Sequence, residues 1–565
     1  MPPGSGPSPS RNSSARSDAP ATRVTWDHYR EQAIDLPALG IRLDTSRMRL
    51  SPEDVAQMRE PMALALEQMA ELEAGARANV DENRRVGHYW LRSPDLAPDP
   101  AIGQAIRDAQ ASILRFAARV HSREIAPPAA PGASDEARFR NLLLIGIGGS
   151  ALGPQLLDDA LSGPEPAMHA YFLDNTDPDG IARVLARLGK GLGETLVVIV
   201  SKSGGTAETR NGMREVEAAL ARLGSALGPR AVAITVPGSK LESHARETGF
   251  LEVFPIWDWV GGRFSITSAV GLLPAALQGF AIDEFLSGAR AMDAETRKSA
   301  IEENPAARLA VAWHLAGGGH GLRNMVVLPY RDRLLLLGRY LQQLVMESLG
   351  KEHDVRGGVV HQGLTVYGNK GSTDQHAYVQ QLREGPDDFF VTFLASRKDA
   401  GLGGRGAHAG THATAGENLE IDPGVTSGDY LLGFLLGTRE ALEEKGRPSI
   451  FLSLPDVSER TLGALIALYE RAVGLYAALI GINAYHQPGV EAGKRAAARA
   501  LKTQARALEA LASAREALAA PEVAARLGDE TQAEMVFHLL EHLAANGRIR
   551  AVPGARWWEA RFARK

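Results

Sequence analysis

The segment SKSGGTAET, residues 201–209, follows a run of aliphatic residues and consists largely of hydroxyl, ammonium and glycine positions. In parallel α/β sheets, ligands bind where strands end, and the helix that follows offers free N–H groups and positive potential. Such a turn suits an anion, because glycines let the backbone approach it closely. The bare pattern also fits a Ser/Thr helix cap with a flexible lead-in. The candidate anion-binding residues are Ser201, Lys202, Ser203, Gly204, Gly205 and Thr206, and the hydroxyl of Thr209 could also donate.

A second glycine turn, GIGGSALG at residues 146–153, also follows an apolar run. It matches a dinucleotide-binding fingerprint if Ala151 takes the place of the last glycine, and Asp174 ends the next strand candidate where a ribose-binding acid would lie. The match is loose, so a nucleotide site and a site for another ligand both remain open at this point. The chain has no G-x-x-x-x-G-K-[ST] motif, which argues against a P-loop nucleotide hydrolase.

Two segments carry residues that could move a proton or stabilise charge. In LQQLVMESLGK, Glu347 could act as a general base, with Gln343 one helical turn away to hold a ligand. A solvated stripe containing a Glu347–Lys351 ion pair explains the same spacing. In VGGRFS, Arg263 could stabilise an oxyanion or could simply pair with a local carboxylate.

Histidine and lysine candidates follow later in the chain. His376 lies among polar turn residues and could act as an acid or base. The segment GINAYHQPGVEAGK offers Gln487 and Lys494. His408 and His412 lie in a glycine-rich stretch without a third ligand, so we interpret them as surface histidines and expect no metal site.

The elements that must position these residues are predicted by alternating short aliphatic runs and helical stretches, which are typical of βαβ units and parallel sheets. One set begins near residue 140 and a second near residue 305, while residues 23–120 look mostly helical. The glycine-rich stretch 399–418 is predicted to be a mobile surface loop. The expected parts are a disordered arm (1–22), a helical N-terminal segment (23–120), two α/β domains (121–300 and 301–495) and a helical C-terminal extension (496–565).

Composition narrows the classes of function. The 565 residues are 44% hydrophobic and 23% charged, as in an ordinary soluble globule, and the net charge of −5 gives no indication of a nucleic-acid partner. The absence of cysteine excludes thiol nucleophiles, disulfides and Cys-ligated zinc, and fits a cytoplasmic protein. The most apolar stretch, LIALYERAVGLYAALIGI, is interrupted by Glu470 and Arg471, so we expect no membrane span. The basic C-terminal tail is interpreted as part of a helix pair with a short hairpin.

Taken together and in this order, six segments resemble those of the glucose-6-phosphate isomerase (phosphoglucose isomerase) family. The resemblance spans residues 145–494 and replaces the nucleotide interpretation of the first glycine turn. It implies two sugar-isomerase (SIS) type α/β/α sandwich domains with mainly parallel sheets, a homodimer, and no cofactor. The matching segments are IGIGGSALGPQ, SKSGGTAET, GGRFS…GLLP, QLVMESLGK, GSTDQHAYVQQLREG and NAYHQPGVEAGK.

The resemblance also implies an activity: reversible isomerisation of glucose 6-phosphate and fructose 6-phosphate in glycolysis and gluconeogenesis, by ring opening and proton transfer between C1 and C2 through a cis-enediolate. By this resemblance Glu347 is the base and Arg263 stabilises the enediolate. His376, supplied across the dimer interface, and Lys494 handle ring opening. The binding residues carried over are Gly149 and Ser150 at the sugar, the loop Ser201–Thr206 at the phosphate, and Gln343 and Gln487 at both.

Three positions depart from the family pattern. Leu349 stands where the family usually has Asn, Gly205 where many members carry an aromatic residue or Thr, and His486 where the family has Asp. Two alternative functions stay open: an isomerase that also accepts mannose 6-phosphate, and a regulator that binds sugar phosphates without chemistry. A regulator would be expected to lose the base, whereas Glu347 is present.

Overall fold

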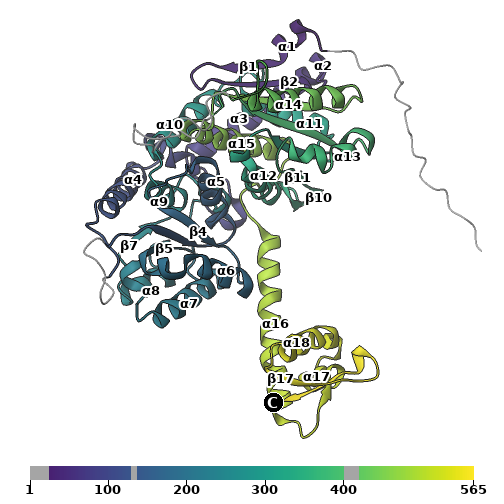
Figure 1. The fold of residues 1–565 in the computed structure, drawn as a ribbon. Helices are drawn as coiled ribbons and strands as arrows, with labels where there is room; N and C mark the ends of the chain where they lie inside the picture. The colour runs from purple at the N-terminus through teal and green to yellow at the C-terminus, as the bar shows by residue number, and fades with distance from the viewer. Residues whose placement is uncertain (1–23, 129–136, 400–418) are drawn as a thin grey trace, which may run out of the picture. The chain divides into compact units, whose positions relative to one another are not determined.

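The computed structural model describes residues 24–128, 137–399 and 419–565 (Figure 1). Contacts divide the chain into two compact units, Met1–His486 and Gln487–Lys565. The predicted disordered arm and the predicted mobile loop, with His408 and His412, lie outside the described residues apart from Asp399.

The first sheet of the main unit is entirely parallel, with strand order β4–β3–β5–β6–β7. Alternate residues of its strands enter two different cores: Leu144 and Val198 pack on one face, and Ile145 and Ile199 on the other. Helices α6, α7 and α8 cover the second face, while α4, α5 and α9 cover the first (Figure 1). Both faces are buried, which explains the continuous aliphatic runs. The strands are β3 (Asn141–Ile145), β4 (His169–Leu173), β5 (Thr195–Val200), β6 (Ala231–Thr235) and β7 (Glu252–Pro255).

The second sheet has the order β1–β2–β15–β12–β8–β11. Its four strands β8 (Asn324–Pro329), β11 (Val366–Tyr367), β12 (Phe389–Ser396) and β15 (Ser449–Leu454) are parallel. A hairpin of β1 (Ala33–Leu36) and β2 (Ile41–Arg47) adds two antiparallel strands at one edge. The two mainly parallel sheets covered by helices agree with the predicted α/β sandwich fold.

The β1–β2 hairpin adds two strands that were not predicted to an N-terminal segment that is otherwise mainly helical. Ile41 and Leu43 are buried while Arg42 between them is exposed, which is the two-residue period of a strand. Gly40, at a φ of 62°, supplies the left-handed residue of the turn between the strands. These strands are short, so their alternating pattern is less evident in the sequence than the longer helical pattern that follows.

Helix α15 forms the centre of the main unit. By length and composition it could cross a membrane, but 89% of its apolar stretch is buried inside the protein. The two charged residues in the middle of its apolar stretch, Glu470 and Arg471, are paired internally: Glu470 and Asp293 both accept from Arg92, and Arg471 pairs with Glu73. The helices of this unit are α1 (Trp26–Gln32), α2 (Pro52–Gln57), α3 (Arg59–Glu73), α4 (Pro100–His121), α5 (Leu152–Leu161), α6 (Pro178–Leu188), α7 (Ala207–Arg222), α8 (Lys240–Glu247), α9 (Ala269–Leu277), α10 (Ile282–Glu295), α11 (Pro305–Ala316), α12 (Leu335–Leu341), α13 (Val379–Glu384), α14 (Ser427–Glu443) and α15 (Glu459–Leu479).

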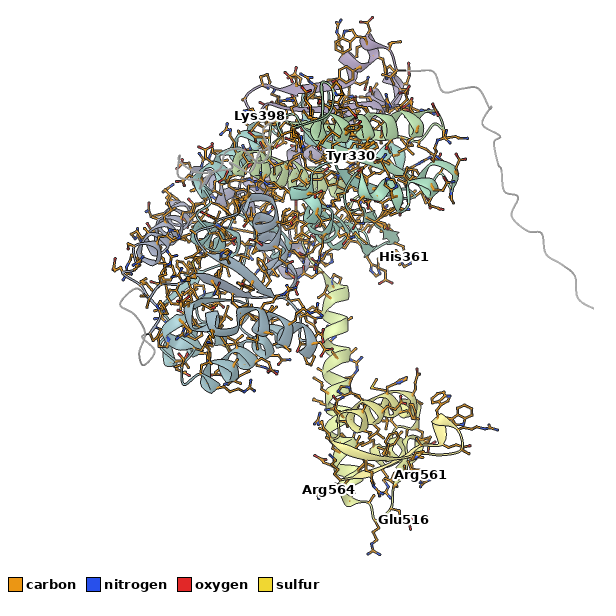
Figure 2. All side chains as sticks on the ribbon, in the orientation of Figure 1. Tyr330, His361, Lys398, Glu516, Arg561 and Arg564 are labelled. Carbon is orange, nitrogen blue, oxygen red and sulfur yellow. The ribbon has the colours of Figure 1, made fainter. Side chains whose placement is uncertain are left out.

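The second unit is a small domain with a core of its own, in which Leu511, Val523, Phe537 and Phe562 are buried. It contains α16 (Pro488–Ser513), α17 (Ala520–Leu527) and α18 (Ala533–Ala545). It also has a sheet of order β16–β18–β17, formed by Leu518–Ala519, Arg561–Arg564 and Ile549–Val552 (Figure 2, which labels the ends of β18). The β17–β18 hairpin agrees with the short hairpin predicted in the basic tail, whereas β16 was not predicted, and the unit begins at residue 487 rather than 496.

Candidate active site

The anion-binding candidate is a closed turn between β5 and α7. Ser201, the first residue after the strand, is buried, and its Oγ donates to Thr206 Oγ1 at 3.1 Å while accepting from the Gly204 N–H at 3.1 Å. Helix α7 begins at Ala207, and the side chain of Thr206 does not cap it. The N–H groups of its first turn therefore receive no side-chain cap from Thr206, and the anion site at this turn stays a prediction.

Lys202 joins this turn to the segment that carries Arg263. Its Nζ donates to the backbone carbonyls of Asp258 at 2.7 Å and Val260 at 2.8 Å. Burial, together with the nearby Arg84 cation, lowers the pKa of Lys202 to about 8. The ammonium thus fixes the position of the turn and adds positive charge to it.

The first glycine turn packs directly against the Arg263 turn. A Cβ on Gly149 would lie 2.1 Å from the carbonyl oxygen of Gly262, so only glycine allows this approach. The Ser265 Oγ donates to the Gly149 carbonyl at 3.2 Å. On the other side, the amide nitrogen of Gln343 lies 3.2 Å from the place where a Cβ of Gly148 would be. The structure therefore brings together the 148–150 turn, Gln343 and Arg263.

Arg263 is buried and held from several sides. Its Nε donates to Ser348 Oγ at 2.6 Å, and its Nη2 donates to the carbonyl oxygens of Ala484 and, at 3.3 Å, of His486. Burial lowers the pKa of Arg263 to about 10, and Glu347 opposes this effect, so the guanidinium remains charged at neutral pH. A fixed, desolvated cation of this kind can stabilise an oxyanion without rearranging.

Glu347 lies beside Arg263. Its Oε2 is 3.6 Å from the Nη1 of Arg263, and 21% of the Glu347 side chain is exposed. Residues Gln342–Glu347 form a π-helical turn after α12, a feature that is frequent at functional sites. The wider turn breaks the four-residue stripe considered from the sequence: Lys351 is buried and donates to the backbone carbonyl of Glu347, not to its carboxylate.

Sequence reasoning missed the second layer of this cluster. Ser348 accepts a hydrogen bond from Arg263, and Lys351 donates to the backbone carbonyl of Glu347. Asp81, from the N-terminal segment, lies beside His486. His486 Nε2 is 3.6 Å from Asp81 Oδ2, and burial lowers the pKa of this histidine. A carboxylate is thus present beside His486, where the family has its own Asp. Because Asp81 is about 400 positions away, no local motif could have indicated it.

Leu349 and Gly205 are the other two positions that depart from the family pattern. Leu349 is fully buried in the main hydrophobic core, where a leucine is well accommodated. Gly205 is exposed, and its N–H donates to the Ser203 Oγ at 3.2 Å. Asp174, the acid considered for a nucleotide ribose, accepts from Gln155 at 2.8 Å and lies 3.6 Å from Arg339.

The remaining predicted residues are His376, Gln487 and Lys494, and their place in the site stays a prediction. His376 is exposed on a short 3₁₀ turn, Thr373–His376. Gln487 and Lys494 belong to the second unit, where Lys494 pairs with Glu491 at 2.8 Å.

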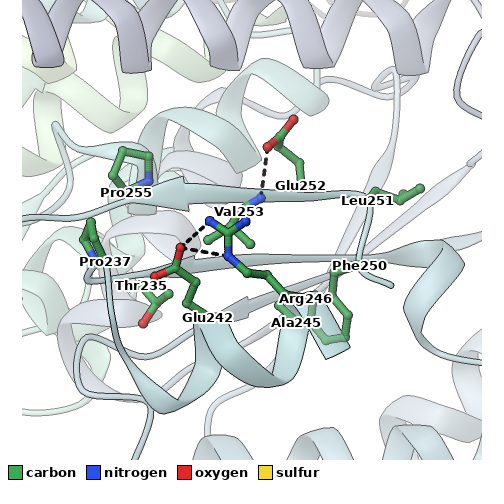
Figure 3. A pocket seen from close by; sticks show the side chains of 10 residues that line it. All are labelled: Thr235, Pro237, Glu242, Ala245, Arg246, Phe250, Leu251, Glu252, Val253 and Pro255. Carbon is green, nitrogen blue, oxygen red and sulfur yellow. Dashed lines mark hydrogen bonds and ion pairs between the residues drawn. The ribbon is translucent and has the colours of Figure 1, made fainter. Parts of the chain in front are cut away.

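A separate pocket of about 230 Å³ lies beside α8 and the ends of β6 and β7 (Figure 3). Arg246 and Glu242, which form an ion pair at 2.6 Å, both line it. None of the candidate residues lines this pocket. In the parts of the chain that the structure describes, no group of three or more His, Asp or Glu residues could hold a metal ion.

The fold and the site together define an α/β protein of the sugar-isomerase type. The family model for phosphoglucose isomerase matches residues 46–412 and 438–517. Glucose-6-phosphate isomerase from Geobacter sulfurreducens is 56% identical over 92% of this chain and 95% of its own length, and that from Thermosynechococcus vestitus is 54% identical over 93% and 95%. A crystal structure of a glucose-6-phosphate isomerase from Chlamydia trachomatis superposes with a TM-score of 0.74 at 26% identity, covering 85% of this chain and 92% of that one. The chain belongs to the phosphoglucose isomerase family.

Proposed function

We propose that this protein interconverts glucose 6-phosphate and fructose 6-phosphate in the cytoplasm. The observation that carries the proposal is the Arg263–Glu347 pair, 3.6 Å apart, in which Arg263 lies on the segment that Lys202 ties to the β5–α7 turn. The curated relatives at more than 50% identity bear the name of this activity. A regulator without chemistry does not need a desolvated guanidinium beside a partly exposed carboxylate.

The phosphate is proposed to bind the β5–α7 turn. The free N–H groups at the start of α7 and the hydroxyls of Ser203 and Thr206 would donate to its oxygens. The binding energy of the phosphate holds the substrate in place and so positions the reacting carbons, which lie several bonds away. Gly149, Ser150 and Gln343 would then contact the sugar.

Glu347 is proposed to remove the proton from C2 of the open-chain aldose and return it to C1. The electron pair left on C2 forms the C1–C2 double bond of the enediolate, and the negative charge on its C1 oxygen faces the fixed cation of Arg263. When C1 takes the proton, the C2 hydroxyl becomes the ketone and its proton passes to the C1 oxygen. A general base of this kind contributes roughly 10²–10⁴-fold to the rate. The reaction moves a proton within the substrate and changes no oxidation state of the enzyme, so it requires no redox cofactor.

Ring opening is assigned to His376 and Lys494, with His376 acting in the site of a second copy. The exposed apolar face of α14 supports such a dimer: Tyr430, Gly433, Phe434 and Gly437 follow the i, i+3, i+4, i+7 pattern and are solvent-exposed. Helix α13, which follows His376 in the chain, packs against α14. The candidate interface is therefore adjacent to the histidine that is proposed to cross it.

A coupled assay tests the proposed function. Fructose 6-phosphate is supplied, and glucose 6-phosphate is detected with a dehydrogenase, with mannose 6-phosphate measured in parallel. We expect turnover with fructose 6-phosphate and its near-complete loss in Glu347→Gln, while binding of a sugar phosphate is retained. A wild-type protein without turnover, or a variant with near-normal kcat, contradicts the assignment.

The shared site is tested separately. Mixing inactive His376→Ala and Glu347→Gln subunits should restore part of the activity, because some sites of the mixed dimer then contain both native residues. Mixed dimers that form and remain inactive would rule out a histidine supplied by the partner.

A further inference from the structure

Lys351 is a buried lysine beside the candidate base that no assigned role explains. It begins β9 (Lys351–His353), and only 5% of it is exposed. Its ammonium donates to the carbonyl oxygens of Glu347 and Ser348, both at 2.8 Å. These two carbonyls lie at the end of the π-helical turn, where backbone acceptors lose their helical partners.

The charged groups around Lys351 include Arg263 and Glu347 of the candidate active site. The Arg263 cation disfavours the protonated amine, whereas the carboxylates of Glu347 and Asp81 favour it. Asp81 is also the acid that lies 3.6 Å from His486. Lys351 therefore places a second positive charge next to Arg263, in a region with little solvent to screen it.

This arrangement is costly for folding. Burial and the Arg263 cation together lower the pKa of Lys351 to about 7, so protonation of this amine is less favourable in the folded protein than in water. A merely structural residue at this position could cap the two carbonyls without a charge. Strongly disfavoured charges of this kind collect at functional sites.

We propose that Lys351 is a positioning residue for Glu347 and Arg263. Its ammonium fixes the two carbonyls that end the turn and thereby the direction of the Glu347 carboxylate. Its charge adds to that of Arg263 in favouring an anion on the substrate. This inference rests on the proposed isomerase function and deepens it.

The first test is Lys351→Met, which keeps a long side chain and removes the charge and the hydrogen bonds. We expect kcat to fall at least tenfold with KM changed less than threefold, because the phosphate turn is untouched. The melting temperature should stay the same or rise, because the variant no longer buries an ammonium. A structural role alone predicts the reverse, a lower melting temperature with normal kcat per folded molecule.

Chemical rescue separates charge from packing. The chain contains no cysteine, so Lys351→Cys carries a single thiol, which can be alkylated in urea before refolding. Bromoethylamine rebuilds an ammonium at nearly the length of lysine, and bromopropane gives a neutral side chain of matched size. We expect kcat to recover at least tenfold with the aminoethyl group and not with the propyl group. Equal recovery by both groups, or unchanged kcat in Lys351→Met, overturns the proposal.

The wild-type protein in the same coupled assay keeps the two hypotheses apart. If the wild type does not convert fructose 6-phosphate, the proposed function itself fails. If the wild type is active and Lys351→Met is equally active, only the role of Lys351 fails.

Discussion

Ser348→Ala is expected to weaken catalysis although it replaces no residue that is proposed to contact the substrate. The hydroxyl of Ser348 is fully buried and accepts from the Arg263 Nε at 2.6 Å. Hydrogen bonds to charged groups contribute about 1.5–3 kcal/mol, and a buried donor without its acceptor loses that contribution. Arg263 keeps its bonds to the carbonyls of Ala484 and His486, so it will tilt away from the missing hydroxyl.

The consequence for the rate follows from that tilt. A displacement of about 1 Å in a catalytic group costs up to about 100-fold in rate, and each factor of ten is about 1.4 kcal/mol. We therefore expect kcat for fructose 6-phosphate to fall between tenfold and 100-fold, with KM nearly unchanged, in the coupled assay. Urea unfolding should show a free energy lower by about 1.5–3 kcal/mol at most.

Ser268→Ala is the matched control for this prediction. Ser268 is also buried and lies on the same segment as Arg263, where it caps α9 by accepting from the Val270 N–H at 3.2 Å. Its loss should lower stability by about 1 kcal/mol and leave kcat within twofold. If Ser348→Ala keeps normal kcat, or if both variants lose activity equally, Arg263 does not depend on this hydroxyl in the way described.

Further predictions concern the turns and the buried lysine. Gly149→Ala places a methyl group 2.1 Å from the Gly262 carbonyl, so we expect a stability loss of roughly 1–3 kcal/mol and strongly reduced turnover; normal kcat would show that the turns can separate freely. Ser203→Ala combined with Thr206→Ala should mainly raise KM, and an unchanged KM would place the phosphate elsewhere. Because the pKa of Lys351 is lowered to about 7 in the folded protein from an ordinary 10.5, the unfolded state binds more protons between these values. The free energy of unfolding of the wild type should therefore rise relative to Lys351→Met by about 1–2 kcal/mol between pH 7 and pH 9 in urea titrations, and a fall would contradict this ionisation.

Much of the fold could be predicted because its signals are local. The β5–α7 turn follows from an aliphatic run and a polar, glycine-rich end, and the structure confirms a parallel strand and an uncapped helix there. The short hairpin predicted in the basic tail is present as β17 and β18. The β1–β2 hairpin and strand β16 were not predicted, because strands of two to seven residues give too short a pattern beside strong helices.

The site could be predicted only in part, for a related reason. The sequence identifies Arg263 and Glu347 one at a time, and spacing alone also allowed a solvated Glu347–Lys351 pair. The π-helical turn shifts the residues after it, so Lys351 points into the protein. Ser348 and Asp81 act through contacts with other segments, and such contacts leave no trace in local spacing.

The transfer of hydrogen by Glu347 is tested most directly by running the isomerisation of fructose 6-phosphate in heavy water and locating deuterium in the product by NMR. The wild-type protein should form glucose 6-phosphate that carries solvent deuterium at C2, increasingly at long incubation, and Glu347→Gln should incorporate none above background. Product that forms at the normal rate and never acquires solvent deuterium would contradict proton transfer by this carboxylate.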